Sequence, residues 1–283
     1  MFNNSLKKEA LRIHKETLDK YDISYEVMKN ACERLYNIRQ NSIELIHFIQ
    51  NVVNSIANKP KDYDTKLGKI GKELICFHET EEYGKEAYNA SIKAGINILG
   101  GLATGMGVAS MAPSALMSIA TTFGTASTGT AISALSGAAA QKAAVAWIGR
   151  TFAGFAVKSG AGMAAGNAFL ALAGPVGWGI TAASTGISLI SLSNRNKELA
   201  NKAIEEAKEI AKARESLDET AEKINSLKAK TELLFTDMTK QRSSLMELVN
   251  ANYTLLSDEK KYFLGSVVNN TLSLSVLLNE TIC

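Results

Sequence analysis

The sequence predicts an all-α protein, an elongated helical bundle or coiled coil that carries a Gly/Ala-rich hydrophobic helical hairpin region. Three observations predict this class. Apolar residues recur at alternating steps of three and four in both ends of the chain. A segment between Glu86 and Glu198 contains neither Asp nor Glu over 111 residues, and 17 of the 21 glycines lie between Gly95 and Gly186. The chain is therefore expected to be polar at both ends and apolar in the middle.

Charge divides the chain into three parts. The segments 1–86 and 198–283 hold 14 acidic residues each, which accounts for all 28 in the sequence. We expect N-terminal amphipathic helices in 1–90, a hydrophobic Gly/Ala-rich membrane-active region in 91–194, and a long C-terminal amphipathic helix with a tail in 195–283.

The N-terminal part has the spacing of a long amphipathic helix from Tyr21 onward. Steps that average 3.5 residues place one apolar stripe along one side of a helix, with polar residues such as Arg39 on the solvated side. Pro60 and the turn-like Lys59–Asp64 predict the end of this helix, and a shorter helix is expected from about Thr65 to Ala90. The stripe consists of Met28, Ala31, Leu35, Ile38, Ser42, Leu45, Ile49, Val52 and Ile56.

The C-terminal part predicts a still longer helix. Neither Gly nor Pro occurs between Ile187 and Leu264, and the same rhythm runs from Ala203 to Leu255. An unbroken helix of roughly 70 residues would extend about 100 Å. Such a rod needs a second long helix to cover its stripe, and the N-terminal helix is the expected partner. Polar members of the stripe argue against a tight dimeric zipper: Glu206, Thr220, Thr231, Gln241 and Asn252.

The tail from Ser266 to Cys283 contains the run TLSLSVLL. Its alternation fits a strand as well as the last turns of a helix. We favour a helix because no second strand is evident to pair with it.

The middle region contains two long runs without charge, 94–141 and 159–194. Each exceeds the ~20 residues that an apolar helix needs to cross a bilayer. Pro113 divides the first run and Pro175 divides the second, which predicts hairpins of helical passes. Trp147 and Trp178 lie near the edges of these passes, where indole rings often mark the membrane–water boundary.

Small residues dominate this region, and only eight leucines occur between Ala94 and Asn194. It gains less from leaving water than a Leu-rich span does, so it is suited to burial in a water-soluble fold and to later transfer into lipid. The pairs Gly101–Gly105 and Gly162–Gly166 have the four-residue spacing that lets helices associate closely in membranes. Tight packing in a water-soluble bundle is the alternative interpretation, and the missing acids favour membrane contact.

The few charges of the middle region are basic. Lys142, Arg150 and Lys158 are spaced by eight residues and do not form one tight stripe on a helix. They are expected either to contact lipid phosphates or a pore lumen, or to be exposed charges of a loop.

Several classes of function are disfavoured. The glycine-rich runs at Gly105 and Gly160 lack the strand and the acidic residue of a dinucleotide site, so no cofactor is expected. Three cysteines and three histidines show no metal-site spacing, and no catalytic residues are identified, so we expect no enzyme. A net charge of +3 does not suggest a nucleic-acid partner. Met1 to Lys20 lacks the apolar core of a secretory signal peptide, which predicts synthesis in the cytoplasm.

The layout of amphipathic flank, charge-poor Gly/Ala hairpin region and second amphipathic flank resembles that of α-helical pore-forming proteins, in particular the cytolysin A and haemolysin BL group. The segment Ala173–Ile180 (AGPVGWGI) is similar to the hydrophobic hairpins of colicin-like and apolipoprotein L-like proteins. The resemblance is one of architecture and rests on no diagnostic motif. The middle region is also longer than the compact insertion element of the cytolysin group. The resemblance implies a water-soluble form that hides the hairpins and releases them on membrane contact for oligomeric pore assembly.

The first hypothesis is therefore a pore-forming or membrane-permeabilising effector. Its expected partners are a lipid membrane and further copies of itself or related subunits, and it would act at a membrane of its own or of a target cell. The alternatives are a water-soluble helical scaffold or partner-binding component with a permanently buried middle region, and an integral membrane protein with coiled-coil flanks.

Overall fold

The computed structural model describes residues 4–93 and 192–280, and this part of the chain is almost entirely helical. The all-α class is thereby confirmed, whereas the predicted hairpin region lies outside the described residues. The only pairing of β type within the described part is an isolated bridge between Ala57 and Asn252. The elements are α1 (Asn4–Ser55), α2 (Lys61–Lys93), α6 (Leu192–Lys240), α7 (Arg242–Met246), the 3-10 helix η3 (Tyr253–Leu255) and α8 (Asp258–Leu277).

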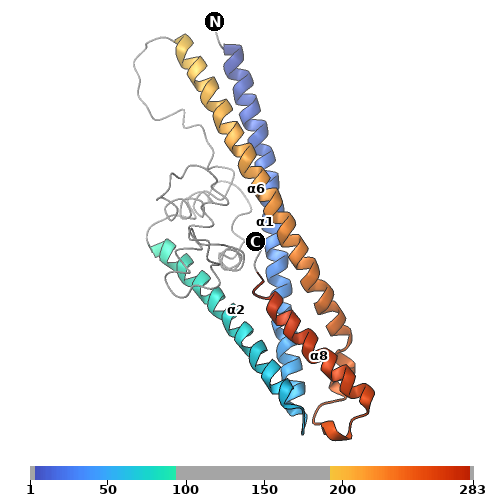
Figure 1. The fold of residues 1–283 in the computed structure, drawn as a ribbon. Helices are drawn as coiled ribbons and strands as arrows, with labels where there is room; N and C mark the ends of the chain where they lie inside the picture. The colour runs from blue at the N-terminus through green and yellow to red at the C-terminus, as the bar shows by residue number, and fades with distance from the viewer. Residues whose placement is uncertain (1–3, 94–191, 281–283) are drawn as a thin grey trace.

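Helices α1 and α6 form a long rod and run in the same direction (Figure 1). Near the N-terminal end of the rod, Ala10 of α1 clusters with Ala200 and Ala203 of α6. A little further along, Nε2 of His14 lies 3.2 Å from Oε2 of Glu206. The predicted partnership of the two long flanks is therefore confirmed. Because the two helices are parallel, the chain that connects the end of α1 to the start of α6 has to run back towards the beginning of the rod.

The stripe predicted in the N-terminal helix is the seam of this rod. All nine of its residues are buried, including Ser42, whose hydroxyl donates a hydrogen bond to the Ile38 carbonyl oxygen in its own helix. The helix starts earlier than the rhythm predicted, at Asn4, and the buried residues Tyr21, Met28, Leu35 and Ser42 follow one another at seven-residue steps. A strict seven-residue repeat indicates a left-handed coiled-coil seam.

Helix α6 supplies the other side of the seam with the same repeat. Its polar member Thr231 is buried and donates a hydrogen bond from its hydroxyl to the Leu227 carbonyl oxygen. The hydroxyls of Ser42 and Thr231 thus bond within their own helices, whereas buried His14 pairs across the seam with Glu206. The buried positions of α6 at seven-residue steps are Ala203, Ile210, Leu217, Ile224, Thr231 and Met238, and Leu245 of α7 continues the series.

The C-terminal apolar rhythm from Ala203 to Leu255 does not form one unbroken helix. Helix α6 ends at Lys240, α7 adds one short turn, and the chain then reverses into α8. Asn250 adopts a left-handed backbone conformation with φ of 58°, which asparagine tolerates better than most residues. Leu255, the last member of the predicted stripe, is 82% exposed in the reversal. The apolar rhythm continues past Lys240 because Leu245 and Leu248 still pack into the same core.

Two loops are pinned together at the end of the rod where the chain reverses, which we call the closed end. The backbone N–H of Ala57 donates to the carbonyl oxygen of Ala251 at 2.9 Å, and the N–H of Tyr253 donates to that of Ala57 at 2.9 Å. The hydroxyl of Ser55 accepts a hydrogen bond from the Asn250 N–H at 2.9 Å. The α1–α2 connection and the α7–α8 connection therefore form one unit.

Helix α8 turns the closed end into a four-helix bundle. It returns along α1, α2 and α6 (Figure 1), and Leu264, Val268 and Leu274 enter the core. The Ser257 side chain accepts a hydrogen bond from the Lys260 N–H and so caps the start of the helix. The tail is thus a helix as far as Leu277, as favoured, and not a strand.

Shortening one isoleucine of the core should destabilise the bundle strongly. Ile49 is fully buried, and we expect Ile49→Ala to lower the free energy of unfolding by about 2–4 kcal/mol because apolar burial is lost and a cavity remains. Ile23 lies on the same helix and is 66% exposed, so Ile23→Ala should change the free energy of unfolding by less than about 0.5 kcal/mol. Urea unfolding followed by circular dichroism measures both. Equal losses would contradict the assignment of the seam.

Candidate functional site

The residues predicted to act at a membrane lie outside the described part of the chain. The residues expected in insertion and oligomerisation are Gly101, Gly105, Trp147, Gly162, Gly166, Pro175 and Trp178. The bases expected at lipid phosphates or in a lumen are Lys142, Arg150 and Lys158. The structure brings none of them into a described site, and their roles stay predictions.

The described helices show where the acid-free segment is attached. Its central part, residues 94–191, follows Lys93 at the end of α2 and precedes Leu192 at the start of α6. The start of α6 lies beside the start of α1, at the opposite end of the rod from the two pinned loops (Figure 1). Helix α2 begins at the closed end, packs along α8 and diverges from the rod (Figure 1). Both attachment points thus lie away from the closed end.

A buried arginine joins the helices of the four-helix bundle. The Arg39 side chain of α1 is 1% exposed, and its guanidinium donates hydrogen bonds to the carbonyl oxygens of Leu277 at 3.1 Å and Glu280 at 3.3 Å. Burial lowers the pKa of Arg39, and the Glu280 carboxylate opposes that shift. A cation at this position satisfies carbonyl groups that the end of α8 leaves without helical partners.

Two further contacts hold the end of α8. The Asn279 side-chain amide donates hydrogen bonds to the carbonyl oxygen of Glu73 at 2.9 Å and to its carboxylate at 2.8 Å. The Lys230 ammonium lies 3.6 Å from the Glu280 carboxylate. The end of α8 is therefore tied to α1, α2 and α6 together, and we call this set of contacts the α8 anchor.

The prediction that Arg39 lies on the solvated side of its helix is wrong. Arg39 belongs to a second buried stripe, next to the seam, that faces the four-helix bundle. The sequence contains a signal for the burial of Arg39, because the three other residues of this stripe, at seven-residue steps from Arg39, are all apolar. The stripe consists of Cys32, Arg39, Ile46 and Val53.

The histidines and cysteines are scattered. His14 is buried in the seam, whereas His47 and His78 are exposed. Cys32 is buried and Cys76 is half-buried. Within residues 4–93 and 192–280, no three His, Cys, Asp or Glu side chains gather as ligands of a metal ion would.

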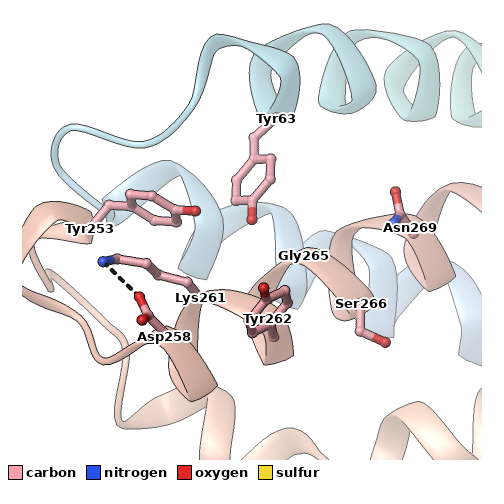
Figure 2. A pocket seen from close by; sticks show the side chains of 8 residues that line it. All are labelled: Tyr63, Tyr253, Asp258, Lys261, Tyr262, Gly265, Ser266 and Asn269. Carbon is pink, nitrogen blue, oxygen red and sulfur yellow. Dashed lines mark hydrogen bonds and ion pairs between the residues drawn. The ribbon is translucent and has the colours of Figure 1, made fainter.

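An open groove of about 720 Å³ lies at the closed end (Figure 2). Tyr63 from the start of α2 and Tyr253 from η3 form one wall, with ring centroids 6.0 Å apart and planes at 87°. Helix α8 forms the other wall, and its charged residues Asp258 and Lys261 pair at 3.5 Å. The remaining lining residues are Tyr262, Gly265, Ser266 and Asn269.

Gly265 allows α2 and α8 to approach closely at this groove. A Cβ atom at this position would lie 3.3 Å from the Tyr63 hydroxyl oxygen, tighter than ordinary packing. Burial raises the pKa of Tyr63 to about 12, and the adjacent Tyr253 hydroxyl adds to the shift. This groove is not visible in the sequence, because its residues come from three elements that only the reversal of the chain brings together.

No family model matches the chain, and no characterised protein or solved structure matches it. Among the helices of the described residues, none has both the length and the apolar character required to cross a bilayer.

Removing the buried guanidinium should loosen the α8 anchor. We expect Arg39→Ala to lower the free energy of unfolding by about 2–4 kcal/mol, because buried carbonyl groups lose a donor and a cavity forms. Amide hydrogen exchange in the last turn of α8 should accelerate more than in α6. Arg34→Ala, an exposed arginine on the same helix, is the control and should have little effect. Unchanged exchange in α8 would contradict the role of Arg39.

Tyr63 should make the bundle sensitive to alkali. Its pKa is raised from 10.0 to about 12 in the folded chain, so the folded state retains a proton that the unfolded state releases. The resulting stability is fully present below pH 10.0 and is lost as the pH rises through about 12. Tyr63→Phe should lessen the fall of the urea midpoint over this range. The urea midpoint of the exposed control, Tyr262→Phe, should fall with pH as that of the wild type does. Identical pH profiles of the urea midpoint for all three proteins would contradict the assignment.

Proposed function

We propose that this chain is a pore-forming or membrane-permeabilising helical effector. In the proposed water-soluble form the described helices hold residues 94–193 away from water. On contact with a membrane these residues insert, and several copies assemble into the permeabilising form. The described helices supply the frame and the contacts between copies.

The observation that carries this proposal is that the two flanks bury their apolar stripes against one another. The seam residues of α1 are covered by α6, and the core of the closed end is built from α1, α2, α6, α7 and α8. The frame therefore has its own source of stability. Such a frame supports a rearrangement in which the middle region moves and the flanks stay folded.

The sequence of the middle region supports the same proposal. It has no acidic residue, yet small residues outnumber leucines, so its preference for lipid over a protein interior is modest. Two states of comparable free energy are what a switch requires, because a membrane then inverts the population with about 5.5 kcal/mol of differential binding. A strongly apolar region would be committed to the bilayer from the start.

Helix association within the membrane is proposed to use closely spaced glycines. Replacing both Gly162 and Gly166 by leucine should prevent close approach of helices and reduce dye release from liposomes at least about tenfold, because small interfacial residues are required for such packing. Gly68→Leu is the matched control. This glycine of α2 is exposed, and a Cβ atom there meets nothing within 4 Å, so dye release should stay at the wild-type level.

Liposome flotation of the same proteins distinguishes the alternatives. We expect the wild type to be water-soluble alone, to float with liposomes and to release dye. A protein that stays unbound and releases no dye at any lipid composition or pH would instead be the scaffold or partner-binding component. A protein that requires detergent from the start would be an integral membrane protein. Either result would exclude the proposed conversion.

A further inference from the structure

We propose that the tyrosine-lined groove at the closed end binds a neutral saccharide. The groove is separate from the middle region to which the proposed function assigns membrane insertion. Its walls come from α2, η3 and α8, all of which are described elements (Figure 2). The inference is therefore independent of whether the chain forms pores.

The size and rigidity of the groove suit a small ligand. Its volume of about 720 Å³ lies within the range of ligand sites. Tyr63 is buried and packs edge-on against Tyr253, and Gly265 leaves just enough room for the Tyr63 hydroxyl. A backbone hydrogen bond from the Tyr253 N–H to the Ala57 carbonyl oxygen helps to hold the second ring in place. A wall that is ordered before binding lowers the entropic cost of binding.

The charges of the groove favour a ligand without net charge. Its one cation, Lys261, pairs with Asp258, the one anion (Figure 2). The Lys261 ammonium also lies 5.9 Å from the centroid of the Tyr253 ring, in the position that a cationic ligand would take. An anionic ligand would have to compete with Asp258 for Lys261. The groove therefore offers neither an anionic nor a cationic ligand an unpaired charge of opposite sign.

The uncharged groups of the lining match the chemistry of sugars. Ser266 and the tyrosines present hydroxyls, and Asn269 presents an amide, so donors and acceptors are both available. A purely apolar ligand would separate Ser266 and Asn269 from water without offering them hydrogen-bond partners. The Tyr262 ring is 81% exposed although it is large and aromatic. An exposed ring beside hydroxyl and amide groups suits a pyranose, whose C–H face packs on the ring while its hydroxyls form hydrogen bonds.

The test uses the full chain without lipid, the three neutral probes lactose, maltotriose and chitotriose, and the two charged probes sialyllactose and phosphocholine. Saturation-transfer NMR and calorimetry should show saturable binding of at least one probe. Tyr262→Ala should weaken that binding at least about tenfold, as loss of a central aromatic contact does. Asn269→Ala should weaken it as well. Leu255→Ala removes an equally exposed side chain that does not line the groove, and should bind like the wild type.

Three results would overturn the proposal. The first is no saturable binding of any of the three neutral probes. The second is binding confined to the charged probes sialyllactose and phosphocholine. The third is equal binding by Tyr262→Ala and Leu255→Ala, which would place the sugar elsewhere on the chain. Because both substitutions are at exposed positions, circular dichroism is expected to confirm that both variants fold.

Discussion

The seam between α1 and α6 is the contact on which the rest of the structure depends. It joins the two ends of the sequence and buries one stripe from each of them, with small alanines near the start of the rod and larger side chains towards the closed end. The two pinned loops, the α8 anchor and the tyrosine-lined groove are all built on helices that this seam positions. The pinned loops and the groove lie at the closed end, whereas the α8 anchor lies at the other end of α8, part-way along the rod.

Much of the frame could be predicted from the spacing of its apolar residues. The stripe from Met28 to Ile56 was correct at every position, because burial in a two-helix seam is governed by a repeat that is visible in one sequence. The partner of this stripe was also correct, since only one other segment had a stripe of comparable length. The spacing of apolar residues does not indicate whether two helices run parallel or antiparallel, so the parallel direction was not predicted.

The end of α6 and the role of Arg39 were missed for physical reasons. No glycine or proline marks the break after Lys240, and the reversal uses Asn250, whose left-handed conformation costs little. Leu245 and Leu248 keep the helical rhythm because they pack into the same core from a different element. Arg39 was assigned by its charge, whereas its neighbours at seven-residue steps determined its burial. The groove depends on the first of these features, since it exists only where the chain that reverses after α7 meets α2.

The parallel seam has a consequence for how the chain is made. On the ribosome, α1 emerges long before α6, which begins only at Leu192, so the side of α1 that packs on α6 waits for its partner while residues 94–191 are synthesised. Contacts of such large sequence separation form slowly, and exposed apolar surface promotes aggregation in the meantime. Synthesis of this protein therefore has a long vulnerable interval, during which a chaperone that shields nascent helices would have the greatest effect on yield.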